Sequence, residues 1–200
     1  MNGLRCLLRD TVVTDGEYRT IDIDSGFTML VAMTNSTRAE RRRLFLIGNG
    51  ASASMASHIG ADLCKNGGIP TDMFTDPSLL TAIANDLGTE HLFSLPLQQR
   101  SASGDVLIAV SSSGSSPNII KAVEVARGKR LSVVTFSAMA EQNPLRASGD
   151  VNFFVPARTY GDAETCHAAL LHYWVDLVAG DISSQIHDAD KSATPQKLAA

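Results

Sequence analysis

The chain has 200 residues, 44% of them hydrophobic and 19% charged, which suits one α/β domain with a buried core and is too short for two comfortable ones. A formal net charge of −4 argues against a protein that binds nucleic acid by neutralising many phosphates. The chain lacks the run of about 18 apolar residues that a membrane span requires. Its three widely separated cysteines fit a reducing compartment, and its first ten residues lack a secretory pattern, so we expect a cytoplasmic protein with neither nucleic acid nor membrane as a partner.

The first 43 residues differ in pattern from the rest. Asp24 or Ser25 fits the N-cap of a helix. The apolar face of that helix consists of Phe27, Leu30, Val31 and Thr34. The arginine-rich run 38–43 suits the C-terminal end of a helix dipole, a better reading than a nucleic-acid patch in an acidic chain. We therefore interpret residues 1–43 as an N-terminal helical extension that serves oligomerisation.

From Leu44 onward, short apolar runs alternate with helical stretches, which indicates βαβ units and a parallel sheet. The predicted strands are 44–47, 73–74, 106–110, 131–136 and 151–155. The predicted helices are 52–65, 77–85, 116–127 and 163–178. We expect a three-layer αβα sandwich of the flavodoxin-like kind, with a mostly parallel five-stranded sheet, over residues 44–182. The polar segment 183–200 is predicted to be a flexible tail.

The segment 48–53, GNGASA, lies between a predicted strand and a predicted helix. Glycines there let the backbone approach a ligand closely, and the helix start offers N–H groups to an anion. The segment also fits the G-x-G-x-x-A form of a dinucleotide fingerprint. That fingerprint needs an acidic residue about 20 positions further on, where Asp72 and Asp76 lie. A nucleotide-cofactor site and a tight turn without a ligand both remain open.

The segment 111–118, SSSGSSPN, follows the predicted strand 106–110 directly. Ser116 and Pro117 suit the N-cap and the first position of a helix. Capping does not explain three serines at the carboxyl end of a buried strand, where open α/β sheets bind ligands. Hydroxyls beside a helix N-terminus form a phosphate cradle without a lysine, and the Gly-Lys-Ser/Thr of a Walker loop is absent. The sequence thus predicts that two loops hold the phosphate of a phosphosugar.

These loops resemble those of the SIS (sugar isomerase) family, and within it those of the phosphoheptose isomerases, over about residues 44–180. Segment 48–52 is similar to the family's G-N-G-G-S loop, and 111–118 to its S-T-S-G-N-S-x-N loop. The stretch 58–63 resembles its H-x-x-x-E helix, 85–86 its N-D pair and 104–108 its G-D-V-L strand entry. The resemblance implies a phosphosugar substrate, a homo-oligomer (a tetramer or a dimer) and zinc, one ion per subunit, with no nucleotide cofactor.

The resemblance also implies roles for individual residues. The phosphate would be held by Ser52, Ser111, Ser112, Ser113 and Ser116. The sugar chain would be lined by Asn49, Gly50, Ala51, Asn85, Asp86 and Glu164. The metal positions fall on His58, Asp62, Glu164 and His172, and of these Asp62 would act as the base and His172 as the acid.

Three positions depart from the family pattern. Asp62 replaces a glutamate, Glu164 replaces a glutamine, and Asn66 falls where the family has an arginine. His58 and Asp62, at i and i+4, share one helix face. Glu164 and His172 are eight residues, about 12 Å, apart on an ideal helix, so either Glu164 precedes the helix or only one of the two is a ligand. Glu164 with His167, at i and i+3, is the alternative pair.

Two functions follow from the resemblance. The first is an aldose–ketose isomerase of sedoheptulose 7-phosphate or a related ketose phosphate, working through an enediol(ate). The second is a non-catalytic phosphosugar-binding regulator, which the altered acid/base positions favour. A nucleotide-cofactor enzyme built on segment 48–53 is a third reading.

Overall fold

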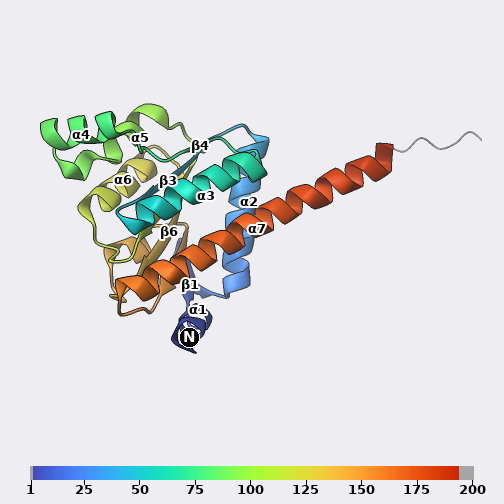
Figure 1. Cartoon of the computed structure of the whole chain (residues 1–200), viewed down its shortest axis with the longest axis horizontal. Coiled ribbons are helices and arrows are strands. Elements are labelled where there is room, and N and C mark those ends of the chain that lie inside the picture. The colour runs from blue at the N-terminus through green and yellow to red at the C-terminus, as the bar shows by residue number, and fades with distance from the viewer. Residues whose placement is uncertain (1, 194–200) are drawn as a thin grey trace, which may run out of the picture.

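The structure, a computed structural model, describes residues 2–193 of the chain, with side chains from residue 3 to residue 180 (Figure 1). Helices and strands alternate along most of it. In chain order the elements are α1 (Asn2–Arg9), β1 (Val12–Asp15), β2 (Thr20–Ile21), α2 (Ile23–Ala39), β3 (Leu44–Gly48), α3 (Ala51–Gly67), β4 (Thr71–Asp72), α4 (Pro77–Asp86), η1 (Thr89–His91), α5 (Ser94–Arg100), β5 (Val106–Ser111), α6 (Pro117–Gly128), β6 (Ser132–Ala138), η2 (Pro144–Ala147), β7 (Val151–Val155) and α7 (Tyr160–Ala193).

The strands form one sheet in the order β2-β1-β7-β6-β5-β3-β4. The five strands from β7 to β4 are parallel, as predicted, and β5 lies between β3 and β6. Every residue of β3, β5 and β7 is buried, because helices cover both faces of the parallel sheet. The α/β fold class is therefore confirmed.

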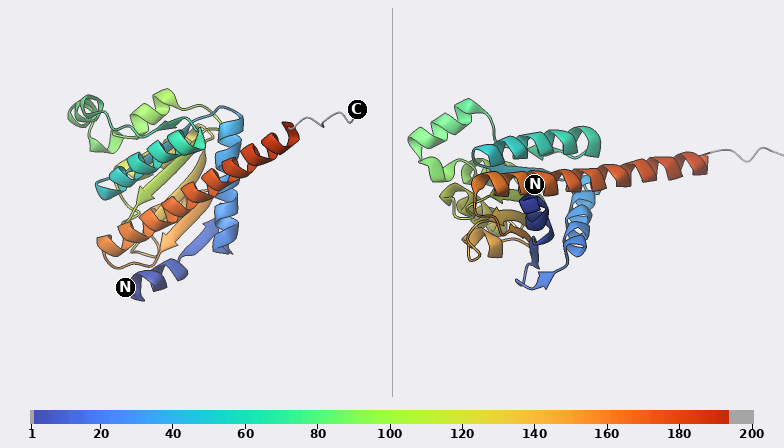
Figure 2. Two further views of the ribbon diagram at one scale, coloured as in Figure 1. Left: turned by 45° about the vertical axis from the view of Figure 1, so that its right-hand side comes forward. Right: turned by 60° about the horizontal axis from the view of Figure 1, so that its bottom comes forward.

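Two hydrophobic clusters make this a three-layer structure. One cluster joins α2, α3 and α7 to one face of the sheet and contains Leu30, Ile59 and Trp174, each almost completely buried. The other joins α5 and α6 to the opposite face through Leu97 and Ile119. On the first face α3 and α7 run side by side, with both N-termini at the carboxyl ends of the strands (Figures 1 and 2).

The N-terminal segment is only partly helical, and the prediction for residues 12–21 is wrong. Val12–Asp15 pairs antiparallel with β7, and Thr20–Ile21 pairs with β1 to complete a hairpin. The sheet thus has seven strands instead of five. The edge of β7 accounts for this, since it offers unpaired backbone groups to the β-branched run that starts at Val12. The predicted helix of this segment exists as α2, and its N-cap is Asp22, whose carboxylate accepts from the Ser25 backbone N–H at 2.8 Å.

The other boundaries differ by a few residues. The weak strand predicted at 73–74 lies at Thr71–Asp72. The last helix starts at Tyr160 and continues to Ala193, so the predicted tail 183–200 begins inside α7, and residues 194–200 lie outside the described part of the chain. No helix of the described residues has both the length and the hydropathy of a membrane span.

Candidate phosphate and acid–base sites

The two glycine- and serine-rich loops meet at the carboxyl ends of the neighbouring strands β3 and β5. The side-chain amide of Asn49 donates to Asn118 Oδ1 at 2.9 Å, and the amide of Asn118 donates to Asn49 Oδ1 at 2.9 Å. Asn118 is buried in the first turn of α6, so this reciprocal pair fixes the first loop against the second. The backbone conformation of Gly50 (φ 55°) is the left-handed type that glycine adopts without strain, and it starts α3 beside this pair.

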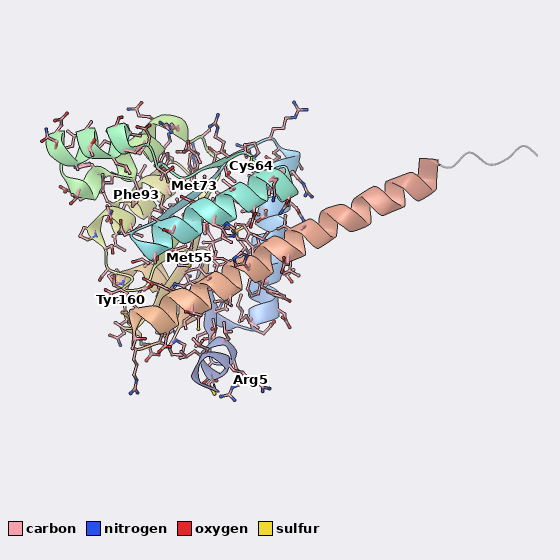
Figure 3. All side chains as sticks on the ribbon, in the orientation of Figure 1. Arg5, Met55, Cys64, Met73, Phe93 and Tyr160 are labelled. Atoms are coloured by element: carbon pink, nitrogen blue, oxygen red, sulfur yellow. The ribbon has the colours of Figure 1, made fainter. Side chains whose placement is uncertain are left out.

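A cavity of about 160 Å³ lies between the loops, and both contribute to its wall. Its lining residues are Asn49, Ser52, Val110, Ser111, Ser112, Ser113, Ser116, Tyr160 and Glu164. All five serines predicted to hold a phosphate therefore share one space. Tyr160, at the start of α7, also lines the cavity (Figure 3). The sequence analysis missed it, because a single tyrosine after a strand matches no binding motif.

Two serine hydroxyls in this cavity keep hydrogen-bonding capacity that the fold does not use. Ser112 Oγ is buried and has no hydrogen-bond partner, although a buried hydroxyl without a partner is costly. Ser116 occupies the N-cap position of α6, but its hydroxyl makes no cap bond and lies 3.4 Å from Ser111 Oγ. These groups, together with the positive ends of α3 and α6, provide a site for an anion. The lining residues include no lysine, arginine or histidine, and the one carboxylate is Glu164.

A second cluster lies between α3 and α7. His58 Nε2 is 3.4 Å from Asp62 Oδ2, and the rings of His58 and His172 have centroids 5.2 Å apart. One ligand atom from each of the three side chains lies within 4.8 Å of the others. The side chain of His58 is 60% exposed and that of Asp62 is 21% exposed, so the cluster is open to solvent. Two imidazoles and a carboxylate in this arrangement fit a zinc ion that keeps one position for water or substrate.

Glu164 does not belong to this cluster, which corrects the predicted four-residue metal set. It lies two turns before His172 on α7 and lines the serine cavity instead. The alternative pair with His167 is also wrong. His167 is fully buried and its Nε2 bonds to the Ser137 carbonyl at 3.1 Å, and this burial lowers the pKa of His167 to about 4.

Asn85 and Asp86 are not brought to the site. Both are exposed in the last turn of α4, where the Asn85 amide donates to the Asp86 carboxylate at 2.7 Å, and neither lines the serine cavity. Gly50 and Ala51 lie at the exposed start of α3, outside the lining of that cavity. Asp105 has a structural role, because its carboxylate accepts from the backbone N–H groups of Arg43 and Ala102.

The acidic residues that a dinucleotide site would use are engaged elsewhere. The Asp72 carboxylate pairs with Arg100 at 3.1 Å, and the Asp76 carboxylate caps α4 by accepting from Leu79 N at 2.8 Å. A second, more apolar cavity of about 210 Å³ lies behind the Gly48–Gly50 loop, with Phe74 and Leu92 in its wall. Neither carboxylate lines it. The geometry thus favours a phosphate between the two loops over a nucleotide beside the first.

Comparison with known proteins identifies the family to which these loops belong. The family model described as "SIS domain" matches residues 27–138, which include both loops and β3 to β6. The chain belongs to the SIS domain family. A phosphoheptose isomerase of Thermodesulfovibrio yellowstonii is 35% identical over 158 residues, covering 76% of this chain and 78% of that protein. Another, of Rhodospirillum rubrum, is 34% identical over 158 residues, covering 76% of this chain and 83% of its own length.

Two solved structures have a similar fold. A phosphoheptose isomerase of Neisseria gonorrhoeae superposes with a TM-score of 0.72 at 28% identity, covering 77% of this chain and 86% of that one. The NanR protein of Vibrio vulnificus, complexed with ManNAc-6P, has a TM-score of 0.65 at 20% identity and covers 96% of this chain and 63% of its own. That second likeness concerns the fold alone.

Proposed function

We propose that this SIS protein is a phosphosugar aldose–ketose isomerase that acts on sedoheptulose 7-phosphate or a related ketose phosphate through an enediol(ate). The observation that carries the proposal is the shared serine cavity with the unpartnered Ser112 hydroxyl, on the same helix pair as the Asp62–His172 cluster. Relatives named phosphoheptose isomerase, similar over three quarters of the chain, support an isomerase.

The spacing of the two sites favours a long sugar. Ser52 and His58 are six residues apart on α3, which is about 9 Å along the helix axis. With carbon–carbon bonds of about 1.5 Å, a substrate needs roughly six or more bonds between its phosphate and its reacting carbons to reach both sites. A hexose or heptose phosphate meets this length, and a triose phosphate does not.

The chemistry requires a base and an acid on neighbouring atoms. Asp62 would remove the proton from the carbon beside the carbonyl, and His172 would protonate the carbonyl oxygen. The proton then returns to the former carbonyl carbon, while the hydroxyl on the neighbouring carbon gives its proton back to His172 and becomes the new carbonyl. Because the carboxylate of Asp62 is one methylene shorter than glutamate, its correct placement depends on how α3 packs on α7.

Three of the implied metal ligands, His58, Asp62 and His172, fit a zinc ion, one per subunit. When bound, the ion supplies a Lewis acid that polarises a carbonyl or hydroxyl oxygen. His58 would hold the ion together with Asp62 and His172. Glu164 would accept hydrogen bonds from sugar hydroxyls in the serine cavity. A homo-oligomer and a cytoplasmic location stay part of this proposal.

Incubation of the purified protein with sedoheptulose 7-phosphate, followed by NMR with and without added zinc, tests the proposal. We expect turnover, and we expect Asp62→Asn to reduce it at least about a hundredfold while phosphosugar binding persists. Asp176→Asn, on the exposed face of α7, is the matched control. Saturable binding without turnover under either condition would instead support the phosphosugar-binding regulator.

A further inference from the structure

Tyr160 is the first residue of α7 and the aromatic side chain in the wall of the serine cavity (Figure 3). It is 59% exposed, the largest fraction among the exposed large hydrophobic side chains of the described residues. An aromatic ring gains free energy when it is buried, so the exposed ring is unfavourable for the fold by itself. A ligand in the cavity would cover part of it.

The start of α7 does not require a tyrosine. Thr159 caps the helix, because its hydroxyl accepts from the Asp162 backbone N–H at 3.2 Å and its carbonyl accepts from the Ala163 N–H at 3.1 Å. Tyr160 does not pack against either hydrophobic cluster, and its phenol oxygen makes no hydrogen bond within the described residues. A substitution of Tyr160 should therefore leave the fold intact, so that its contribution to binding can be measured by itself.

The two sides of the cavity offer different chemistry. The loop side supplies serine hydroxyls and the N–H groups of two helix starts, which donate hydrogen bonds as a phosphate requires. The α7 side supplies Tyr160 and, one turn later, Glu164. Neither suits a phosphate, because the face of an aromatic ring carries a partial negative charge and Glu164 is an anion. The α7 side therefore faces a different part of the ligand.

The face of an aromatic ring suits C–H groups, whose hydrogens carry a small positive charge. A sugar has such groups along its carbon chain, beside the hydroxyls from which Glu164 would accept hydrogen bonds. Tyr160 and His172 are twelve residues apart, about 18 Å along α7, so the ring lies far from the acid–base cluster. The carbon atoms within reach of Tyr160 are accordingly those nearest the phosphate.

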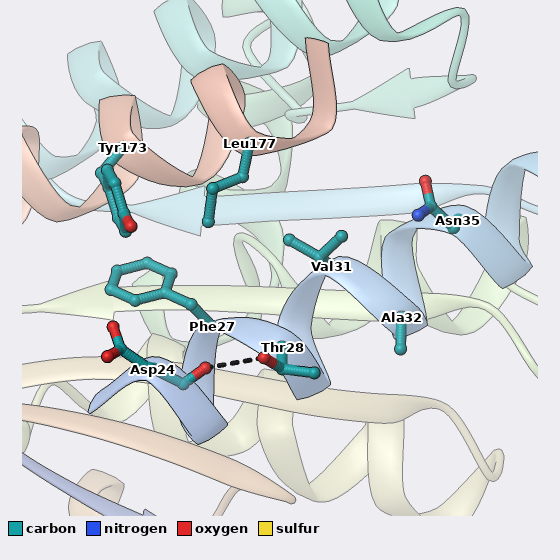
Figure 4. Close-up of a pocket in the computed structure, with 8 residues that line it drawn as sticks. All are labelled: Asp24, Phe27, Thr28, Val31, Ala32, Asn35, Tyr173 and Leu177. Carbon is teal, nitrogen blue, oxygen red and sulfur yellow. Dashed lines mark hydrogen bonds between the residues drawn. The ribbon is translucent and has the colours of Figure 1, made fainter. Parts of the chain in front are cut away.

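Tyr173, another exposed tyrosine of α7, has different surroundings (Figure 4). Its ring stands edge-on to Phe27, with centroids 4.8 Å apart, in a cavity of about 520 Å³ between α2 and α7. The residues that line that cavity include no serine, and the charged one among them is Asp24. Of these two tyrosines, Tyr160 is the one that shares a cavity with anion-binding groups.

We propose that Tyr160 is a specificity-determining residue whose ring packs against the carbon chain of a phosphosugar, next to the phosphate. The serine cavity thereby distinguishes a sugar phosphate from inorganic phosphate, because the ring contributes only when carbon atoms follow the phosphate. The inference rests on phosphosugar binding, which the proposed isomerase and the alternative regulator share, and not on catalysis.

Calorimetry with two ligands tests the proposal: sedoheptulose 7-phosphate, which has a carbon chain, and inorganic phosphate, which has none. We expect Tyr160→Ala to weaken binding of sedoheptulose 7-phosphate about five- to tenfold and to leave the affinity for inorganic phosphate unchanged. Tyr160→Phe keeps the ring and should keep both affinities. Thr165→Ala, at an exposed position of the same helix outside the cavity, is the matched control and should also keep both.

An unchanged melting temperature of each variant confirms that the body is folded. Equal losses for both ligands, or no loss for either, would overturn the proposal. A loss in Tyr160→Phe as large as in Tyr160→Ala would also contradict it, because the hydroxyl and not the ring would then make the contact. The same holds for a wild-type chain that binds neither sedoheptulose 7-phosphate nor fructose 6-phosphate more tightly than inorganic phosphate. The expected affinities without turnover would contradict only the isomerase.

Discussion

Asn49 and Asn118 exchange two hydrogen bonds of 2.9 Å across 69 residues of sequence. Each amide satisfies the other, so neither side chain is free to rotate toward the cavity or away from it. The pair thereby holds the starts of α3 and α6 at the separation that the serine cavity requires. Loop geometry in this site thus depends on a contact between two side chains as well as on glycine.

Asn118→Ala should loosen this connection. It removes both hydrogen bonds of the exposed Asn49 side chain, each worth about 0.5–1.5 kcal/mol of the free energy of unfolding. We also expect the affinity for a phosphosugar, measured by calorimetry, to fall about tenfold. Asn49→Ala should give a similar loss, and the double variant little more than either alone, because both remove one interaction. Fully additive losses would show that the two amides act independently.

Ser112→Ala tests the unpartnered hydroxyl. Because Ser112 Oγ makes no hydrogen bond in the fold, its removal should leave the melting temperature unchanged or slightly raised. The affinity for a phosphosugar should nevertheless fall by about tenfold, the value of one hydrogen bond to a charged group. Ser115→Ala, at the exposed position of the same loop, serves as the control. Equal affinities for both variants would remove Ser112 from the binding site.

Measurements of zinc affinity test whether Glu164 is a metal ligand together with His58, Asp62 and His172. His58→Ala or His172→Ala removes one of three ligands, so the zinc affinity in a chelator competition should drop by at least about a hundredfold, the loss of a few kcal/mol. Glu164→Gln should leave zinc affinity unchanged, because this carboxylate lies in the serine cavity. It should instead strengthen binding of the phosphate group, since a like charge is removed. A zinc affinity that depends on Glu164 would contradict this arrangement.

His167 should make stability depend on pH. Burial lowers its pKa from 6.5 to about 4 in the folded chain, so between these values the unfolded chain binds a proton that the folded chain does not. The free energy of unfolding should therefore fall as pH drops from 6.5 to 4, by at most about 3 kcal/mol. His167→Gln, measured by urea unfolding across this range, should flatten the dependence. Equal curves for wild type and His167→Gln would refute the assignment.

Several elements followed directly from local sequence. The buried runs at β3, β5, β6 and β7 and the serine loop lie where their composition places them, because continuous β-branched and aliphatic residues suit a sheet covered on both faces. The hairpin β1–β2 was missed, since four residues beginning at Val12 carry too little pattern to reveal a partner strand as distant in the sequence as Val151–Val155. The length of α7 was also missed, because its polar end resembles a tail.

The sequence by itself determined the fold class, the two loops and the serine-rich composition of the proposed anion site. Only the tertiary structure decided which predicted residues meet. It joined His58 and Asp62 to His172, moved Glu164 from the metal set to the serine cavity and left Asn85 and Asp86 on the surface. The physical reason is that spacing along one helix fixes only which residues share a face, whereas the packing of α3 on α7 fixes which faces oppose each other.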